Sequence, residues 1–328
     1  MKYRKLGKTG MEISEVSLGT WQVGGKWGAP FNMSSAQEII HKAIDEGVNF
    51  IDTADIYGDG YSEKAVGKVV KERNEKVFVA TKAGKKLNPF NADGFTEQNL
   101  ENFVDDSLKN MGLETIDLLQ LHCPPPDLYK KPEVFESLDK IKQKGKIQHY
   151  GSSVETIDEA FMAMEYPGVE TIQIIFNMFR LRPIEDLFNK VEKDSMGFII
   201  RVPLASGLLS GKFSKETTFD KKDHRFFNRG GMFFDKGETF SGINYDKGLE
   251  AVEELKELFQ TKDDLYKYAI KWILMFDNIS CVIPGASRAE QIKGNLEAVH
   301  LPDFTSEQME AVEDIYNRYF KEDIHHLW

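Results

Sequence analysis

The chain has 328 residues, of which 41% are hydrophobic and 29% are charged, so it can bury a large core and has the composition of an ordinary globular protein. Its formal net charge is -11 and it has no block of Lys or Arg, which argues against binding to nucleic acid or to an anionic membrane. The N-terminal segment lacks a signal-peptide pattern and no apolar run approaches the roughly 20 residues of a membrane span, so we expect a cytoplasmic protein.

Strand and helix patterns alternate along the chain after a short opening hairpin around Gly7 and Gly10. The predicted strands lie at residues 16–19, 49–52, 77–81, 116–121, 147–150, 171–176, 198–202 and 280–283. They are mostly short, continuous apolar runs, which are typical of parallel strands buried on both faces. Helical periodicity is found at residues 36–46, from 62 onwards, and at 96–110, 132–144, 156–164, 184–194, 265–276 and 306–319. Eight strand–helix units predict an α/β fold, a (β/α)8 TIM barrel forming one domain over residues 1–328.

A few features lie outside this alternation. Residues 213–246 are rich in Gly, Phe, Asp and Arg, and we interpret this long segment as a flap over the barrel mouth after strand seven. His325 and His326 have no Cys or carboxylate set beside them, so no metal site is expected. Cys123 and Cys281 lie in apolar segments and are expected to be buried free thiols.

Polar side chains stand at the ends of three successive predicted strands. Asp52 ends the second strand, Lys82 and His122 follow the third and fourth, and Tyr57 lies in the loop after the second. Because the C-terminal strand ends of a barrel share one rim, we expect these four side chains to meet. Lys82 would lower the pKa of the Tyr57 phenol, and Asp52 would keep the ammonium charged. Tyr57 could then protonate a carbonyl oxygen while His122 hydrogen-bonds it.

Reduction of a carbonyl also needs a cofactor, since no protein side chain delivers hydride. The chain has no strand-associated GxGxxG motif. Two other segments, residues 202–212 and 283–295, follow the seventh and eighth strands, where phosphate sites recur in barrels. The first is rich in small residues, and the second places Ser287 and Arg288 at a helix N-terminus.

Together these segments resemble the aldo-keto reductase superfamily, in a bacterial-type branch. The resemblance covers nearly the whole chain, in the stretches VSLGTW, FIDTADIYG, VATK, LLQLH, GSSV, QIIFN, PLASGLLSGK and IPGASRAEQIKGN. It implies a barrel closed at its bottom by the hairpin, NADPH (NADP+) as cofactor, and reduction of an aldehyde or ketone to an alcohol. By position it implies the catalytic residues Asp52, Tyr57, Lys82 and His122, with Tyr57 as proton donor. The implied cofactor-binding residues are Gly19, Thr20, Trp21, Asp52, Ser153, Gln173, Arg201, Pro203, Leu204, Ser206, Gly207, Leu209, Gly211, Lys212, Gly285, Ser287, Arg288, Gln291 and Asn295.

The chain departs from the family pattern at two positions near the expected nicotinamide. Val154 stands where many members have Asn, and Arg201 stands where many have a Tyr that stacks on the ring. A positive Arg201 beside a cationic oxidised ring predicts a bias toward reduced cofactor. The preference for NADPH over NADH is assigned mainly to Arg288.

Two other functions remain open from the residues alone. The first is a cofactor-binding sensor or partner subunit of the same fold with little turnover. The second is a different barrel enzyme in which Lys82 forms a Schiff base, which would leave Tyr57, Asp52 and the two nucleotide-like loops without a role.

Overall fold

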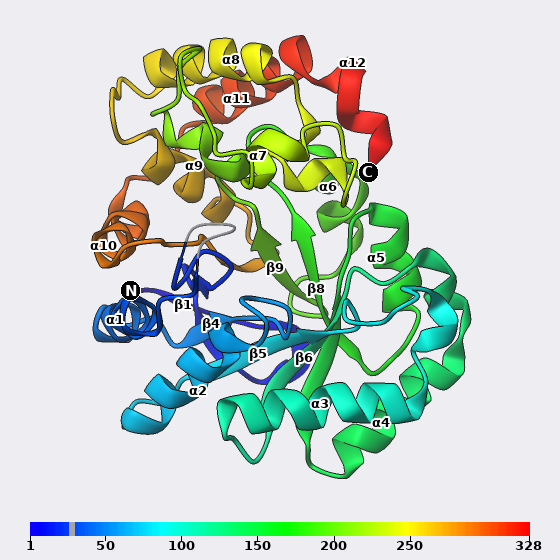
Figure 1. The fold of residues 1–328 in the computed structure, drawn as a ribbon. Coiled ribbons are helices and arrows are strands. Elements are labelled where there is room, and N and C mark those ends of the chain that lie inside the picture. Colours follow the sequence, from blue (N-terminus) through cyan, green and yellow to red (C-terminus); the bar gives the residue numbers. More distant parts are fainter. Residues whose placement is uncertain (26–29) are drawn as a thin grey trace.

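The computed structural model describes residues 1–25 and 30–328. Within these residues, parallel strands pair in chain order: β3 (Leu18–Gly19), β4 (Phe50–Asp52), β5 (Phe78–Ala83), β6 (Ile116–His122), β7 (Ile147–Ser153), β8 (Val169–Ile175), β9 (Gly197–Arg201) and β10 (Ile279–Val282). Parallel bridges between Val16 and Val282, and between Gly19 and Gly285, join the first strand to the last. The sheet therefore curls into the predicted (β/α)8 barrel (Figure 1).

A hairpin of β1 (Tyr3–Lys5) and β2 (Glu12–Ser14) covers the N-terminal end of this barrel. Three of its apolar side chains, Leu6, Met11 and Ile13, share a buried cluster with barrel residues Phe50, Phe78, Ala80, Leu118, Ile199, Cys281 and Ile283. The hairpin backbone approaches so closely that a Cβ at Gly7 would lie 2.3 Å from the backbone nitrogen of Gly197. Only glycine fits there, and the prediction of a hairpin that closes the barrel bottom is confirmed.

Along β4, β5 and β6 the inward-facing side chains change from apolar to polar. Successive strand residues point to opposite faces, and Phe50, Ala80 and Leu118 belong to the cluster inside the barrel. Two residues further along the same strands come Asp52, Lys82 and Gln120, which are therefore on the inward face as well. The strands therefore place a layer of polar side chains near their C-terminal ends, next to the apolar cluster inside the barrel.

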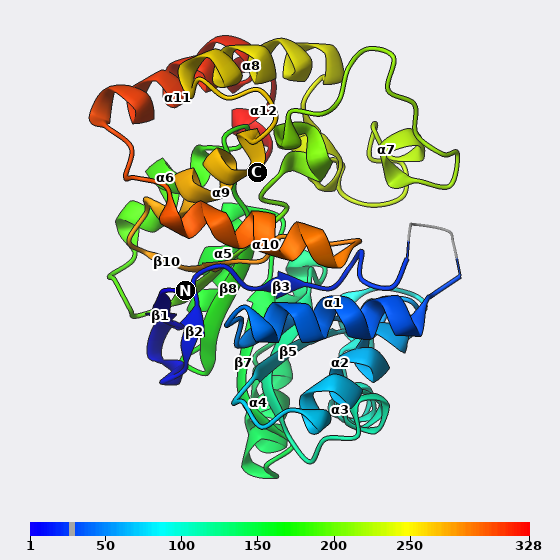
Figure 2. The same cartoon turned by 90° about the vertical axis from the view of Figure 1, so that its left-hand side faces the viewer.

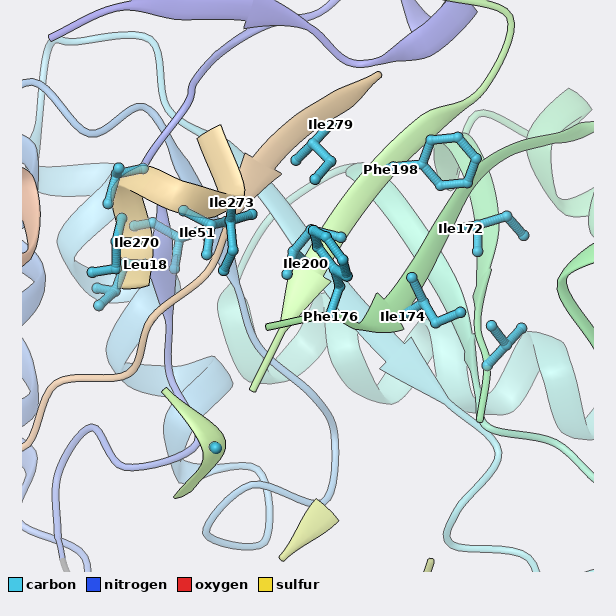
Figure 3. Packing of buried hydrophobic residues seen from close by; sticks show 14 of the residues in the cluster. Leu18, Ile51, Ile172, Ile174, Phe176, Phe198, Ile200, Ile270, Ile273 and Ile279 are labelled. Atoms are coloured by element: carbon cyan, nitrogen blue, oxygen red, sulfur yellow. The ribbon is translucent and has the colours of Figure 1, made fainter. Parts of the chain in front are cut away.

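Helices cover the outside of the barrel. They are α1 (Met33–Asp45), α2 (Tyr61–Glu72), α3 (Glu97–Met111), α4 (Pro132–Gln143), α5 (Ile157–Met164), α6 (Arg182–Asp186), α9 (Leu265–Leu274) and α10 (Ala289–Glu297). The outward residues of the strands pack against them: Figure 3 shows Phe198 and Ile200 of β9 in this layer together with Ile270 and Ile273 of α9. Of the helices described, none is both long and apolar enough to cross a membrane.

Further helices lie at one side of the barrel. In Figures 1 and 2, α8 (Tyr245–Leu258) and α11 (Ser306–Tyr319) run side by side, with α12 (Lys321–Ile324) at the end of the chain. No predicted helix corresponds to α8, although Asn244 caps its first turn and Leu249, Val252 and Leu255 follow helical spacing. The short helix α7 (His224–Phe227) lies inside the predicted flap (Figure 2).

The predicted helix at residues 184–194 is wrong. The chain instead forms the short α6, a break at Leu187, and a 3₁₀ helix at Phe188–Lys190. Leu187 and Phe188 are buried in the core, and the side-chain amide of Asn278 donates to the carbonyl oxygen of Phe188 at 2.5 Å. Core packing and this tertiary hydrogen bond replace the helical pairing that periodicity predicted.

Candidate active site

A cavity of about 1530 Å³ lies at the C-terminal ends of the barrel strands. Asp52 ends β4, Lys82 is the last residue but one of β5, and His122 ends β6. Tyr57 lies in the loop after β4. Asp52, Tyr57 and His122 line the cavity, while Lys82 lies directly behind Tyr57 and is only 1% exposed. The structure thus brings the four predicted catalytic residues together.

The Lys82 ammonium is the centre of this group. Its Nζ donates to Oδ2 of Asp52 at 2.5 Å and to the carbonyl oxygen of Thr53 at 2.9 Å, and lies 3.4 Å from the Tyr57 hydroxyl. Burial lowers the pKa of Lys82, but Asp52 and Tyr57 outweigh it, so the pKa stands above its usual value. Lys82 is therefore a buried cation at neutral pH, held beside the phenol oxygen.

Two glutamines hold the other carboxylate oxygen of Asp52. The side-chain amides of Gln120 and Gln173 donate to Oδ1 at 3.0 and 2.8 Å, respectively. The Gln173 amide also donates to the Gln120 oxygen at 3.1 Å, and the Ser153 hydroxyl lies 3.5 Å from the Gln173 oxygen. Gln173 is thus tied by hydrogen bonds to Asp52 and Gln120, and it also lies at the position implied for cofactor contact.

Tyr57 and His122 face the cavity as a protonated phenol and a neutral imidazole. Burial raises the pKa of Tyr57 to about 12, although Lys82 acts to lower it. The expected lowering of the pKa by Lys82 is present, but removing the phenol from water has the larger and opposite effect. Burial also lowers the pKa of His122 well below its usual value, with Lys82 adding to the effect. Its Nδ1 has no hydrogen-bond partner among the described residues, and its ring centroid lies 6.0 Å from that of Tyr57.

The predicted cofactor-binding residues gather along the other part of the same cavity. Those that line it are Gly19, Thr20, Trp21, Asp52, Ser153, Gln173, Arg201, Pro203, Leu204, Ser206, Gly207, Lys212, Gly285, Ser287, Arg288, Gln291 and Asn295. Leu209 instead packs in the core, and Gly211 ends the 3₁₀ helix Ala205–Ser210 in a left-handed conformation. The side chain at 209 and the residue at 211 therefore shape the loop rather than face the cavity.

This cavity end has the features of an anion site. Val202, Ala205, Ser206 and Gly207 all have positive φ, which produces a tight, irregular loop of the kind that presents backbone N–H groups. Lys212 and Arg288 line the cavity and form no ion pair with a carboxylate in the described part of the chain. Gln291 accepts from the backbone nitrogen of Ser287 at 2.8 Å and so orders the start of α10. Two unpaired cations beside such a loop fit a phosphate-bearing ligand.

The flap closes over the cavity through Arg201. The guanidinium pairs with the Glu238 carboxylate of the flap and donates to the carbonyl oxygen of Val154 at 2.9 Å. The Ser206 hydroxyl donates to the backbone oxygen of Glu238 at 2.8 Å and accepts from the Phe240 nitrogen at 3.0 Å. The predicted flap is therefore tied to the end of β9 and to the loop that follows it.

The sequence model of the Aldo/keto reductase family matches residues 15–317. The chain belongs to this family. It is 31% identical over 301 residues to the aldo-keto reductase YhdN of Bacillus subtilis (strain 168), covering 89% of this chain and 87% of that protein. Among solved structures it resembles the glycerol dehydrogenase AKR11B4 from Gluconobacter oxydans, with a TM-score of 0.77 and 31% identity over 97% of this chain and 96% of that one. The aldo-keto reductase AKR11C1 from Bacillus halodurans gives a TM-score of 0.78 and 25% identity, covering 99% of both chains.

Membership confirms the resemblance found in the sequence. It makes this aldo/keto reductase an oxidoreductase of carbonyl compounds, in a family that uses nicotinamide cofactors. No group of three or more potential metal ligands is found among the residues described. His325 hydrogen-bonds the Tyr316 hydroxyl at 3.0 Å, which is an ordinary structural contact.

Sequence reasoning missed two residues of this reductase site. Gln120 carries a usable signal, because it is a polar residue inside an apolar strand, two positions before His122 and on the same face. Glu238 carries none: it lies 37 residues after Arg201 in an irregular segment, and only the fold brings them together.

Proposed function

We propose that this protein reduces aldehydes or ketones to alcohols with NADPH, using Tyr57 as the proton donor, and that residues 1–328 act as one domain. The observation that carries the proposal is the buried Lys82 ammonium, 2.5 Å from Asp52 and 3.4 Å from the hydroxyl of a protonated Tyr57 at the cavity wall. Lys212 and Arg288, unpaired at the other end of the cavity, suit the phosphates of the cofactor.

NADPH, when bound, supplies hydride to the carbonyl carbon. The residues of this chain bind and protonate the carbonyl oxygen. Neutral His122 can donate a hydrogen bond from one ring nitrogen to the carbonyl oxygen and orient it. With a pKa of about 12, Tyr57 stays protonated until negative charge develops on that oxygen, and then transfers its proton to complete the alcohol.

The remaining polar residues act on Tyr57 through the Lys82 ammonium, which lies beside the phenol oxygen. Loss of the proton leaves a tyrosinate, which the adjacent Lys82 ammonium stabilises. Asp52 keeps Lys82 charged and in place, and Gln120 and Gln173 fix the carboxylate by hydrogen bonds to its second oxygen. Each residue of this buried network therefore helps to stabilise the tyrosinate, directly or through Lys82, which an ion pair that only stabilised the fold would not do.

The test is NADPH oxidation with a panel of aldehydes and ketones, comparing wild type with Tyr57→Phe. Loss of the hydroxyl should lower kcat by about 10²- to 10⁴-fold, the usual contribution of a general acid. NADPH binding, followed by fluorescence titration, should survive. Tyr3→Phe is a matched control, because Tyr3 is half exposed on the hairpin at the opposite end of the barrel.

Each contrary result points to a different function. Tight NADPH binding without turnover of any carbonyl would favour the sensor or partner subunit. Absence of NADPH binding would exclude both, and borohydride trapping of an adduct on Lys82 would then support the Schiff-base enzyme.

A further inference from the structure

Two ionisable side chains flank His122 at the cavity wall. Lys85 lies two residues beyond the end of β5, and Glu155 lies two residues beyond the end of β7. Both strands pair with β6, which ends at His122, so the two residues come from opposite sides of that histidine. Both line the cavity that Tyr57 and His122 also line.

Lys85 is anchored without being neutralised. Its Nζ donates to the carbonyl oxygen of Cys123 at 3.2 Å and lies 4.4 Å from the ring centroid of Phe90. It forms no ion pair with any carboxylate of the described residues. Because an ammonium has three N–H donors, Lys85 can bind another oxygen in the cavity while keeping this anchor.

Glu155 has a fixed backbone and an unpaired carboxylate. Its backbone nitrogen donates to Glu159 at 2.8 Å, and its carbonyl oxygen accepts from Arg180 at 2.5 Å. The carboxylate itself makes no hydrogen bond or ion pair within residues 1–25 and 30–328. Burial raises the pKa of Glu155 to about 7, so near neutral pH this group can accept or donate a hydrogen bond.

Several other charged residues at the cavity are paired, although Lys212 and Arg288 at its other end form no ion pair within the described part of the chain. Asp52 pairs with Lys82, Arg201 with Glu238, and Arg225 with Asp223. Unpaired polar groups that line a substrate cavity are costly to cover with apolar atoms, because they lose water without gaining a partner. The ligand that covers Lys85 and Glu155 should therefore supply both an acceptor and a donor.

We propose that Lys85 and Glu155 form a subsite for a hydroxyl group of the substrate, so that the enzyme prefers short hydroxylated aldehydes or ketones. The proposal rests on the reductase function above. A hydroxyl group can accept from the ammonium and donate to the carboxylate at the same time. An anionic substituent would gain from Lys85 but meet the Glu155 charge, and an alkyl substituent would leave both groups without a partner.

The test compares glyceraldehyde with propanal, which differ only in the two hydroxyl groups, in wild type, Lys85→Met and Glu155→Met at saturating NADPH. For each variant, kcat/KM for glyceraldehyde should fall by about tenfold more than kcat/KM for propanal, the effect expected for loss of a hydrogen bond to a charged group. Lys85→Arg should restore the preference. Lys86→Met is the matched control, because Lys86 is the adjacent exposed lysine and lies outside the cavity lining.

Equal losses on the two aldehydes, or a wild type without preference for glyceraldehyde, would overturn the hydroxyl subsite while leaving the reductase function intact. A wild-type preference for glyceraldehyde 3-phosphate over glyceraldehyde that disappears in Lys85→Met would also overturn it, in favour of an anion subsite. If wild type turns over neither aldehyde nor any other carbonyl compound, the reductase function fails and the subsite fails with it.

Discussion

Replacing Asp52 with Asn should destabilise the protein strongly at neutral pH. The substitution keeps the size of the side chain but removes the negative charge 2.5 Å from a lysine that is only 1% exposed. Lys82 then has the Thr53 carbonyl oxygen and the Tyr57 hydroxyl as neighbours, and neither carries a charge at neutral pH. Removing one partner of a buried ion pair typically costs about 3–5 kcal/mol, because the other charge stays buried without compensation.

The loss of unfolding free energy in Asp52→Asn should become smaller as the pH rises. In wild type the pKa of Lys82 is raised, so the ion pair stabilises the fold fully below the unfolded pKa of about 10.4 and is lost only above that range. Without Asp52, burial becomes the main influence and lowers the pKa of Lys82 below its unfolded value. The unfolded variant then binds more protons than the folded one, so its stability rises between neutral pH and about pH 10. Each unit by which the folded pKa falls returns about 1.4 kcal/mol.

The assay is urea unfolding of wild type and Asp52→Asn at pH 7 and pH 9.5, with the difference in unfolding free energy compared between the two pH values. Asp323→Asn is a matched control, since Asp323 pairs with Lys247 at 2.6 Å but both side chains are about half exposed. Its midpoint should stay near that of wild type at both pH values. A loss below about 1 kcal/mol for Asp52→Asn, or a loss that does not change with pH, would refute the assignment of Lys82 as a buried cation that depends on Asp52.

Two further substitutions test the cofactor end of the cavity and the flap. Arg288→Ala should raise KM for NADPH by about tenfold or more and raise KM for NADH less, because only NADPH carries the additional phosphate that an unpaired guanidinium would bind. Equal changes in KM for the two cofactors in steady-state assays would contradict this role. Glu238→Gln should speed tryptic cleavage of the flap at Arg225 and Arg229, because it removes the ion pair with Arg201. The control is Glu216→Gln, since the Glu216 side chain bonds only Ser214 in the described structure. Equal cleavage rates in the two variants would contradict the anchoring role of Glu238.

The strand pattern could be predicted from sequence because most barrel strands contain a short apolar run, but the strand ends could not. The strands predicted at 77–81, 116–121 and 147–150 extend to Ala83, His122 and Ser153. Lys82, His122 and Ser153 lie in these extensions, and such polar residues resemble the beginning of a loop. They belong to the strands because barrel pairing continues to the rim, where each side chain finds a polar neighbour: Lys82 has Asp52, and Ser153 has Gln173.

The meeting of the four candidate catalytic residues could likewise be predicted, because it depends on strand order and on the shared rim of a barrel. Their electrostatic balance could not. Whether Lys82 or burial controls the pKa of Tyr57 depends on how completely the phenol is removed from water, and the fold buries it enough for the pKa to rise to about 12. A proton donor needs to hold its proton until the carbonyl oxygen becomes basic, so this outcome suits the proposed role of Tyr57 better than a strongly acidified phenol would.

For Arg201, too, the sequence gives the charge of the side chain but not the charges that surround it in the fold. Considered alone, its charge predicts repulsion of the oxidised, cationic nicotinamide and a bias toward the reduced form. In the structure the guanidinium is paired with Glu238, so the field at the cavity wall is that of an ion pair rather than of an isolated cation. The partner comes from the flap, and it also raises the pKa of Arg201 against the effect of burial. Any influence of Arg201 on the cofactor therefore depends on where the flap lies, which links the charge beside the proposed nicotinamide position to closure of the cavity.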